Sequence, residues 1–176
     1  MPKAGVLRIA GDTLLATQLM QRSPIYIVMG VSGSGKTTVG KLLAERLDLP
    51  FHDADDFHSA ANIEKMSNGI PLNDDDRAGW LADMAAAITK WETTGGAVLA
   101  CSALKEAYRQ TLQHGARESI RWVFLDGSRE LLSDRIEHRK GHYMAVDMLD
   151  SQLETLEKPA HVSRSTRRRP AAGSGQ

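Results

Sequence analysis

The residues best suited to chemistry lie at positions 30–37, where the sequence reads Gly-Val-Ser-Gly-Ser-Gly-Lys-Thr. This pattern of glycines followed by lysine and threonine binds phosphate groups, because backbone N–H groups can then point into one concavity. Lys36 supplies a positive charge for the β- and γ-phosphates, and the Thr37 hydroxyl completes the ligand shell of Mg²⁺. We therefore predict a site for ATP and Mg²⁺ whose nucleotide contacts come from Gly30, Val31, Ser32, Gly33, Ser34, Gly35, Lys36, Thr37 and Thr38.

The segments that flank this loop support the same interpretation. An apolar run at 25–29 predicts a buried strand before the loop, and apolar residues at helical spacing predict a helix over 37–47 after it. The start of a helix adds the positive end of its dipole to a phosphate site. The alternative is a glycine-rich turn that binds nothing, but such a turn does not require a strand before it and a helix after it.

Two carboxylates, Asp53 and Asp55, follow a second predicted strand that ends at 51–52. In a doubly wound sheet this position faces the phosphate loop. One carboxylate can reach the water shell of a metal ion, and the other can accept the proton of an attacking hydroxyl group. We predict that Asp53 and Thr37 hold the metal and that Asp55 is catalytic. An acidic, solvated loop is the alternative.

The rest of the chain alternates strand-like runs with helical patterns. The predicted strands lie at 97–101 and 122–125, and the predicted helices at 60–66, 77–91, 105–114 and 129–139. This alternation is typical of an α/β fold of the P-loop NTPase type, a doubly wound parallel sheet with helices on both faces. We expect a nucleoside-monophosphate-kinase-like domain over 23–159 with a small lid near 135–150, preceded by a poorly ordered extension at 1–22.

The composition narrows the classes of partner and cellular setting. The 176 residues carry no net charge, which gives no reason to expect nucleic acid or a membrane surface as a partner. No apolar run reaches the roughly 20 residues that a membrane-spanning helix needs. The single cysteine, Cys101, excludes an intramolecular disulfide and favours a reducing, cytoplasmic setting, and we expect it to pack in the core.

Further motifs identify the class of phosphate-binding protein. The chain has neither the Asn-Lys-x-Asp motif of GTPases nor the Leu-Ser-Gly-Gly-Gln motif of transporter ATPases. The phosphate loop and six further blocks, in the same order along the chain, resemble gluconate kinases. The six blocks lie at 52–58 (HDADDFH), 62–66 (NIEKM), 69–77 (GIPLNDDDR), 99–109 (LACSALK, then YR), 141–144 (GHYM) and 149–157 (LDSQLETLE). The resemblance implies an enzyme of gluconate utilization that transfers the γ-phosphate of ATP to the 6-hydroxyl of D-gluconate, as a cytoplasmic homodimer.

Gluconate is a linear polyol with a carboxylate, so its site needs a cation and several hydrogen-bonding groups. Arg77, which follows three aspartates at a predicted helix start, is the candidate for the carboxylate. Its alternative role is a structural ion pair with Asp74 or Asp76. His58 is a candidate donor to a substrate hydroxyl, or else a plain loop histidine.

Four more residues complete the predicted site. Ser102 and Lys105 lie just past the third strand, at the edge of the sheet where ligands bind, although Lys105 could also be an ordinary surface lysine. Arg135 and Arg139 are four positions apart and therefore share one helix face. Related small kinases carry lid arginines here that clamp the phosphates, and a solvated helix face is the alternative.

The predicted mechanism is direct in-line transfer without a phosphoenzyme, with Lys36 and the lid arginines neutralising the moving phosphoryl group. A shikimate kinase shares the phosphate loop and the Asp-x-Asp pattern, but its third strand ends in a run of glycines where this chain has Cys101-Ser-Ala-Leu. A regulatory module that binds nucleotide without turnover is a second alternative. The stretch at 62–77 argues against it, because a sensor needs no polyol site.

The chain ends unlike the family that it resembles. After Pro159 the resemblance implies an apolar fifth strand and a closing helix, whereas residues 160–176 are rich in arginine, serine and glycine. Such a composition is typical of disorder, and a short basic tail on a neutral chain is weak evidence for nucleic-acid binding. We therefore expect a disordered tail that leaves the fourth strand uncovered, with modest stability, self-association and weakened ATP affinity.

Overall fold

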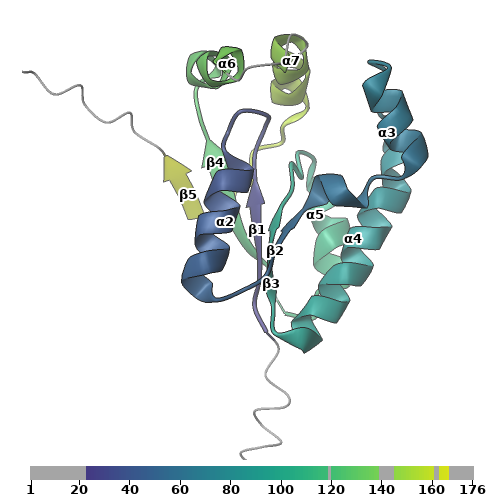
Figure 1. Cartoon of the computed structure of the whole chain (residues 1–176), viewed down its shortest axis with the longest axis vertical. Coiled ribbons are helices and arrows are strands. Elements are labelled where there is room, and N and C mark those ends of the chain that lie inside the picture. The colour runs from purple at the N-terminus through teal and green to yellow at the C-terminus, as the bar shows by residue number, and fades with distance from the viewer. Residues whose placement is uncertain (1–22, 119, 139–144, 161–162, 167–176) are drawn as a thin grey trace, which may run out of the picture.

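The predicted strands form one parallel sheet in the computed structural model, which describes residues 23–118, 120–138, 145–160 and 163–166. The strands run in the order β2-β3-β1-β4-β5, and every neighbouring pair is parallel (Figure 1). Their bounds are β1 Ile25–Met29, β2 Phe51–Asp53, β3 Ala97–Ala100, β4 Arg121–Asp126 and β5 Ser163–Thr166. The predicted α/β fold with a doubly wound parallel sheet is confirmed.

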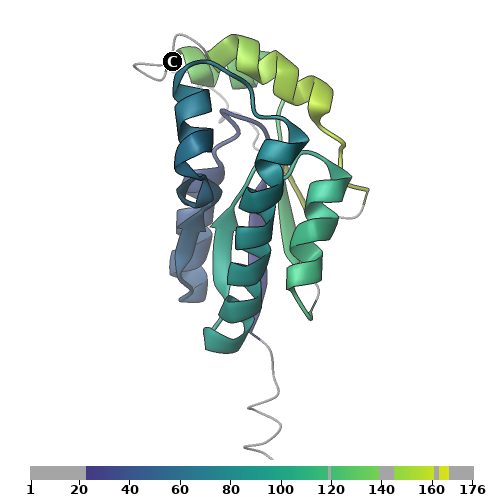
Figure 2. The same cartoon turned by 90° about the vertical axis from the view of Figure 1, so that its right-hand side faces the viewer.

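Helices cover both faces of the sheet. They are α2 Lys36–Leu47, the short 3₁₀ helix η1 Ala54–Phe57, α3 Ala60–Ser67, α4 Asp74–Thr94, α5 Glu106–Gly115, α6 Arg129–Glu137 and α7 Ala145–Thr155. Helix α2 packs on one face, and α4 and α5 lie side by side on the other (Figures 1 and 2). In the described part of the chain, no helix is both long enough and apolar enough to cross a membrane.

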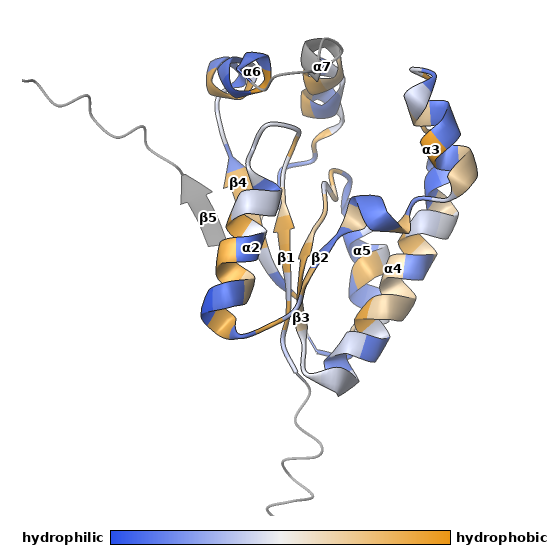
Figure 3. Ribbon diagram, viewed as in Figure 1, coloured by the Kyte–Doolittle hydropathy of each residue, from blue (hydrophilic) through white to orange (hydrophobic). Residues whose placement is uncertain are grey.

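Alternation along β1 explains why both faces are covered. Ile25, Ile27 and Met29 face the core beneath α4 and α5, whereas Val28 belongs to the cluster beneath α2. Because successive side chains of a strand point to opposite faces, a central strand with apolar residues at almost every position needs cover on both sides. Figure 3 shows hydrophobic residues gathered on the central strands.

Helix α4 begins at Asp74, three residues before the predicted start at position 77. A capping box explains the difference: the Asn73 side chain accepts a hydrogen bond from the Asp76 N–H, and the Asp76 carboxylate accepts one from the Asn73 N–H. The three aspartates before Arg77 thus form the first helical turn, where the positive end of the helix dipole stabilises their negative charges.

Helices α6 and α7 lie beyond the end of the sheet where β1 ends (Figures 1 and 2). A bidentate ion pair between Arg129 and Asp150 joins them, with N–O distances of 2.6 and 2.7 Å. Leu149 is fully buried in a cluster of apolar residues that spans both helices and the phosphate loop, together with Val31, Leu104, Leu132 and Ile136. The end of α6 and the first half of α7 fall in the region predicted as the lid at 135–150. Residues 139–144 of that region lie outside the described part of the chain.

The expectation that the fourth strand is uncovered is wrong. Residues 163–166 form β5, which pairs in parallel with Val123–Asp126 of β4. A pairing strand needs to supply only backbone N–H and C=O groups, so a segment that reads Ser-Arg-Ser-Thr can still cover this edge. The predicted extension at 1–22 and the tail residues 161–162 and 167–176 lie outside the described part of the chain.

Candidate active site

The loop between β1 and α2 has the backbone shape that a phosphate site requires. Gly33 and Gly35 have φ values of 78° and 91°, in the left-handed region that favours glycine. A Cβ on Gly30 would lie 2.9 Å from both the Leu125 carbonyl oxygen and the Ser34 hydroxyl. The Ser34 side chain is buried, and its hydroxyl has no hydrogen-bond partner among the described residues. This narrow glycine-lined cradle with a buried unsatisfied hydroxyl fits the phosphates of ATP.

Lys36 and Thr37 open helix α2 directly after this cradle. Lys36 Nζ donates to the Val31 carbonyl oxygen at 3.0 Å, so the ammonium group lies back over the start of the loop. The Thr37 hydroxyl donates to Asp53 Oδ2 at 3.1 Å. The hydroxyl and the carboxylate predicted to share a metal are therefore in contact, although they come from the two ends of the α2–β2 unit. Thr38, the last predicted nucleotide contact, is exposed on α2.

Asp53 also shapes the segment that carries Asp55. Its Oδ1 accepts a hydrogen bond from the Asp55 N–H at 3.2 Å and caps η1, while its Oδ2 faces Thr37. The described residues contain no group of three or more His, Cys, Asp or Glu side chains that could hold a metal. A single hydroxyl and a single carboxylate fit Mg²⁺, which commonly takes few protein ligands and fills its remaining positions with phosphate and water oxygens.

The Asp55 carboxylate has both negatively and positively charged groups near it. Partial desolvation by the surrounding protein raises the pKa of Asp55 first, and the charge of Asp53 raises it further, while His58 and Lys36 act to lower it. The side chain is 89% exposed, so water reaches the carboxylate and stabilises its ionised form. Asp55 is therefore an ionised carboxylate within reach of the field of the loop lysine.

His58 is more enclosed than a loop histidine would be. Its side chain is 9% exposed and its ring stacks on Trp80, with 4.9 Å between ring centroids. Trp80 in turn donates from Nε1 to the Ala54 carbonyl oxygen at 2.7 Å, which ties the pair to η1. His58 Nε2 lies 4.0 Å from Asp55 Oδ1, and Nδ1 is buried without a hydrogen-bond partner among the described residues. Burial lowers the pKa of His58, so the ring is neutral at pH 7.

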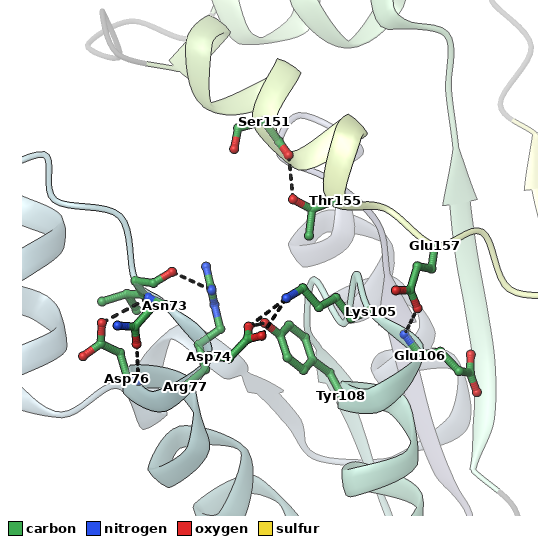
Figure 4. Close-up of polar contacts among 11 residues, drawn as sticks. Asn73, Asp74, Asp76, Arg77, Lys105, Glu106, Tyr108, Ser151, Thr155 and Glu157 are labelled. Atoms are coloured by element: carbon green, nitrogen blue, oxygen red, sulfur yellow. Dashed lines mark hydrogen bonds and ion pairs between the residues drawn. The ribbon is translucent and has the colours of Figure 1, made fainter.

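Arg77 lies in the first turns of α4 (Figure 4). Its positive charge adds to the lowering of the His58 pKa. Its Nη1 donates to the Leu72 carbonyl oxygen at 2.6 Å, and its guanidinium lies 6.0 Å from the centroid of the Tyr108 ring. Among the described residues no ion pair joins Arg77 to Asp74 or Asp76, the alternative considered for it. Asp74 and Asp76 bind other side chains instead, so the guanidinium of Arg77 is not held in an ion pair with either of them.

Those other partners form a network between α4 and α5 (Figure 4). Asp74 accepts hydrogen bonds from Lys105 Nζ, at 2.8 and 2.9 Å, and from the Tyr108 hydroxyl. These bonds, with that from Lys105 first, lower the pKa of Asp74. Asp76 is paired with Lys65 at 2.6 Å. Lys105, predicted to approach the substrate, is therefore anchored to α4 in this structure.

The remaining predicted residues are distributed as follows. Ser102 follows β3 and is half-buried, at the predicted edge of the sheet. Arg135 is half-buried in the last turn of α6, and Arg139 lies outside the described residues. Cys101 is buried in the core as expected, and burial raises the pKa of its thiol to about 12, which leaves it chemically inert at neutral pH.

Two polar residues near the site were not predicted to act there. Gln152 of α7 accepts a hydrogen bond from the Ser32 N–H of the phosphate loop at 2.7 Å. Arg109, which is 5% exposed, donates to the carbonyl oxygens of Leu104 at 3.1 Å and Glu157 at 2.9 Å, and so ties the segment after β3 to the segment after α7. Both lie in blocks that resemble gluconate kinases, which was the only signal for them in the sequence.

Comparison with known proteins agrees with this geometry. A family model described as "Shikimate kinase" matches residues 32–169. The gluconokinase of Gluconobacter oxydans is 48% identical over 144 residues, which cover 81% of this chain and 80% of that protein. A probable gluconokinase of Xenopus tropicalis is 46% identical over 155 residues, covering 80% of this chain and 82% of that protein.

Solved structures give the same result. The crystal structure of a gluconokinase from Sinorhizobium meliloti matches with a TM-score of 0.76 and 42% identity, covering 85% of this chain and 86% of that one. An APS kinase of Mycobacterium tuberculosis, with a TM-score of 0.63 at 21% identity, shares the fold. The family model thus describes the type of domain, and the curated relatives narrow the assignment: the chain belongs to the gluconokinase family of P-loop kinases.

Proposed function

We propose that this protein transfers the γ-phosphoryl group of ATP to the 6-hydroxyl group of D-gluconate, giving 6-phospho-D-gluconate. One observation carries the proposal beyond the family assignment. His58 Nε2 lies 4.0 Å from Asp55 Oδ1, the charges of Lys36 and His58 both act on Asp55, and the charge of Arg77 acts on His58. The lysine proposed to bind phosphate, the proposed base and the arginine proposed to bind the carboxylate are therefore grouped in one site.

On the acceptor side, each of these groups has a task that its surroundings support. Asp55 is ionised and exposed, so it can accept the proton of a sugar hydroxyl as that oxygen attacks. The neutral His58 ring can exchange a hydrogen bond with the polyol chain through Nε2, the nitrogen that lies 4.0 Å from Asp55 Oδ1. Arg77 uses one N–H on Leu72 and has others left for the substrate carboxylate. Ser102 and Lys105 are proposed as further contacts.

On the donor side, the loop residues bind and orient. When bound, Mg²⁺·ATP supplies the phosphoryl group and the cation that neutralises its oxygens. The backbone of residues 30–38 would hold the phosphates, Thr37 and Asp53 would hold the cation, and Lys36 would add positive charge for the β- and γ-phosphates. Arg135 and Arg139 are proposed to add positive charge from the lid. No covalent intermediate on the protein is required for this in-line transfer.

Gluconate-dependent release of ADP tests the proposal, with shikimate and with no acceptor as parallel assays. We expect turnover with gluconate and Mg²⁺, little with shikimate, and a further loss when EDTA removes the metal. Preference for shikimate would support the main alternative, a shikimate-kinase-like enzyme. ATP binding without turnover on either acceptor would support a regulatory module instead.

The cellular setting and assembly are part of the same proposal. We propose a cytoplasmic enzyme with a small-molecule substrate and without a nucleic-acid or membrane partner, in line with the neutral chain and its single cysteine. We also propose a homodimer, as the family resemblance implies. Light scattering after size exclusion tests the dimer, and a mass of about 19.3 kDa would contradict it.

A further inference from the structure

The peptide unit between Val31 and Ser32 is held from both of its sides. Its carbonyl oxygen, on Val31, accepts a hydrogen bond from Lys36 Nζ at 3.0 Å. Its N–H, on Ser32, donates to Gln152 Oε1 at 2.7 Å. A trans peptide is planar, with C=O and N–H pointing in opposite directions, so these two bonds fix the rotation of one plane within the phosphate loop.

Gln152 is placed by a helix that has its own anchors. Leu149, one turn earlier in α7, is fully buried beside Val31. Asp150 is fixed to α6 by the bidentate pair with Arg129. After the helix, the Glu157 N–H donates to the Leu104 carbonyl oxygen at 2.9 Å. Helix α7 is therefore held in place by contacts other than those of Gln152. The helix is the fixed support from which the Gln152 side chain reaches the phosphate loop.

We propose that Gln152 is a positioning residue for phosphoryl transfer that acts through Lys36. By holding the Ser32 N–H, it keeps the Val31 carbonyl directed at Lys36 Nζ, and so keeps the ammonium group over the start of the loop, where its charge is available to the phosphates of ATP. Without this acceptor the peptide plane can rotate, and a flexible lysine side chain loses the carbonyl that guides it. The inference rests on the proposed function and assigns a role in it to a residue outside the phosphate-binding motif.

Gln152→Met is the direct test, because methionine has a similar length and no carbonyl acceptor. We expect kcat for gluconate phosphorylation to fall roughly tenfold, since the lysine keeps its charge but loses its alignment. ADP affinity should stay nearly unchanged, because the backbone donors and the helix dipole remain. The matched control is Gln110→Met on the exposed side of α5, which should behave as the unmodified protein.

A double-mutant cycle separates positioning from general support of the fold. Lys36→Ala alone should lower turnover by about 100-fold or more. If Gln152 acts through this lysine, adding Gln152→Met to Lys36→Ala should lower kcat by less than about twofold further. A further tenfold loss in the double variant would mean that the two residues act independently, and it would overturn the proposal.

Hydrogen exchange at the Ser32 amide provides a readout that needs no turnover. Exchange at Ser32 should be faster in Gln152→Met than in the unmodified chain or in Gln110→Met. The exchange rates of the amides in α7 should stay unchanged. Equal exchange rates would show that Gln152 does not hold the loop. An unmodified chain without gluconate-dependent turnover would overturn the proposed function, and the exchange rates would still decide the role of Gln152.

Discussion

Replacement of Arg77 by methionine should impair the use of gluconate far more than the use of ATP. Methionine keeps an apolar stem, but it removes a guanidinium that spends one Nη1–H on the Leu72 carbonyl oxygen, at 2.6 Å, and has other donors available. A hydrogen bond to a charged group contributes about 1.5–3 kcal/mol. If the substrate carboxylate takes those donors, kcat/KM for gluconate should fall roughly 10- to 150-fold.

The assay is ADP release over a range of gluconate concentrations at saturating Mg²⁺·ATP, repeated with an uncharged six-carbon polyol. The loss should appear mainly in the KM for gluconate, and the preference for gluconate over the polyol should fall by a similar factor. Arg46→Met, at an exposed position in the last turn of α2, is the matched control. An unchanged gluconate KM would refute the reasoning and leave Arg77 only its contact with Leu72.

Three other predictions concern the base, the buried histidine and the edge strand. Asp55→Asn should lower kcat with ATP affinity nearly intact, whereas Asp53→Asn should raise the Mg²⁺ concentration needed for turnover; the same metal dependence in both variants would contradict this division. The pKa of His58 is lowered in the fold, so below its ordinary value of 6.5 the unfolded chain binds the proton more readily. Stability should therefore be full above about pH 6.5 and decline below it, and His58→Gln should flatten that decline in urea titrations; an equal decline would exclude His58 as its source. A chain that ends at Ala160 lacks β5 and should melt a few degrees lower and self-associate in light scattering, whereas identical behaviour would show that the strand adds nothing.

The centre of the fold could be predicted because its signals are local. The apolar run of β1, the glycine pattern and the helical spacing of α2 follow one another within residues 25–47, so each supports the others. Asp53 is predictable for the same reason, because the carboxyl end of a strand in such a sheet faces the phosphate loop that carries Thr37. Short-range patterns of this kind determine an element, its neighbours and the edge on which the site lies.

The contacts between distant segments could not be predicted in the same way. Nothing local marks Gln152 as the acceptor for Ser32, because that contact depends on how α7 packs against the phosphate loop. The sequence predicts that Lys105 faces a ligand. Its ion pair with Asp74 could not be predicted, because it depends on how the start of α4 packs beside the start of α5. Strand β5 was missed for a different reason: an edge strand pairs through its backbone, which a composition rich in serine and arginine does not reveal.

The position of β1 in the sheet has a consequence for how the protein acquires its activity during synthesis. Ile25 pairs with Ala97 and Tyr26 with Arg121, so the first strand made receives its neighbours only after most of the chain exists. Closing such long loops slows folding, and an apolar strand that waits for partners is prone to aggregate. The carbonyl of Leu125 beside Gly30 also comes late. A nascent chain that stops before β4 therefore contains the whole phosphate-binding motif without the support that shapes it, and the ability to bind nucleotide should emerge only after β4 has been made.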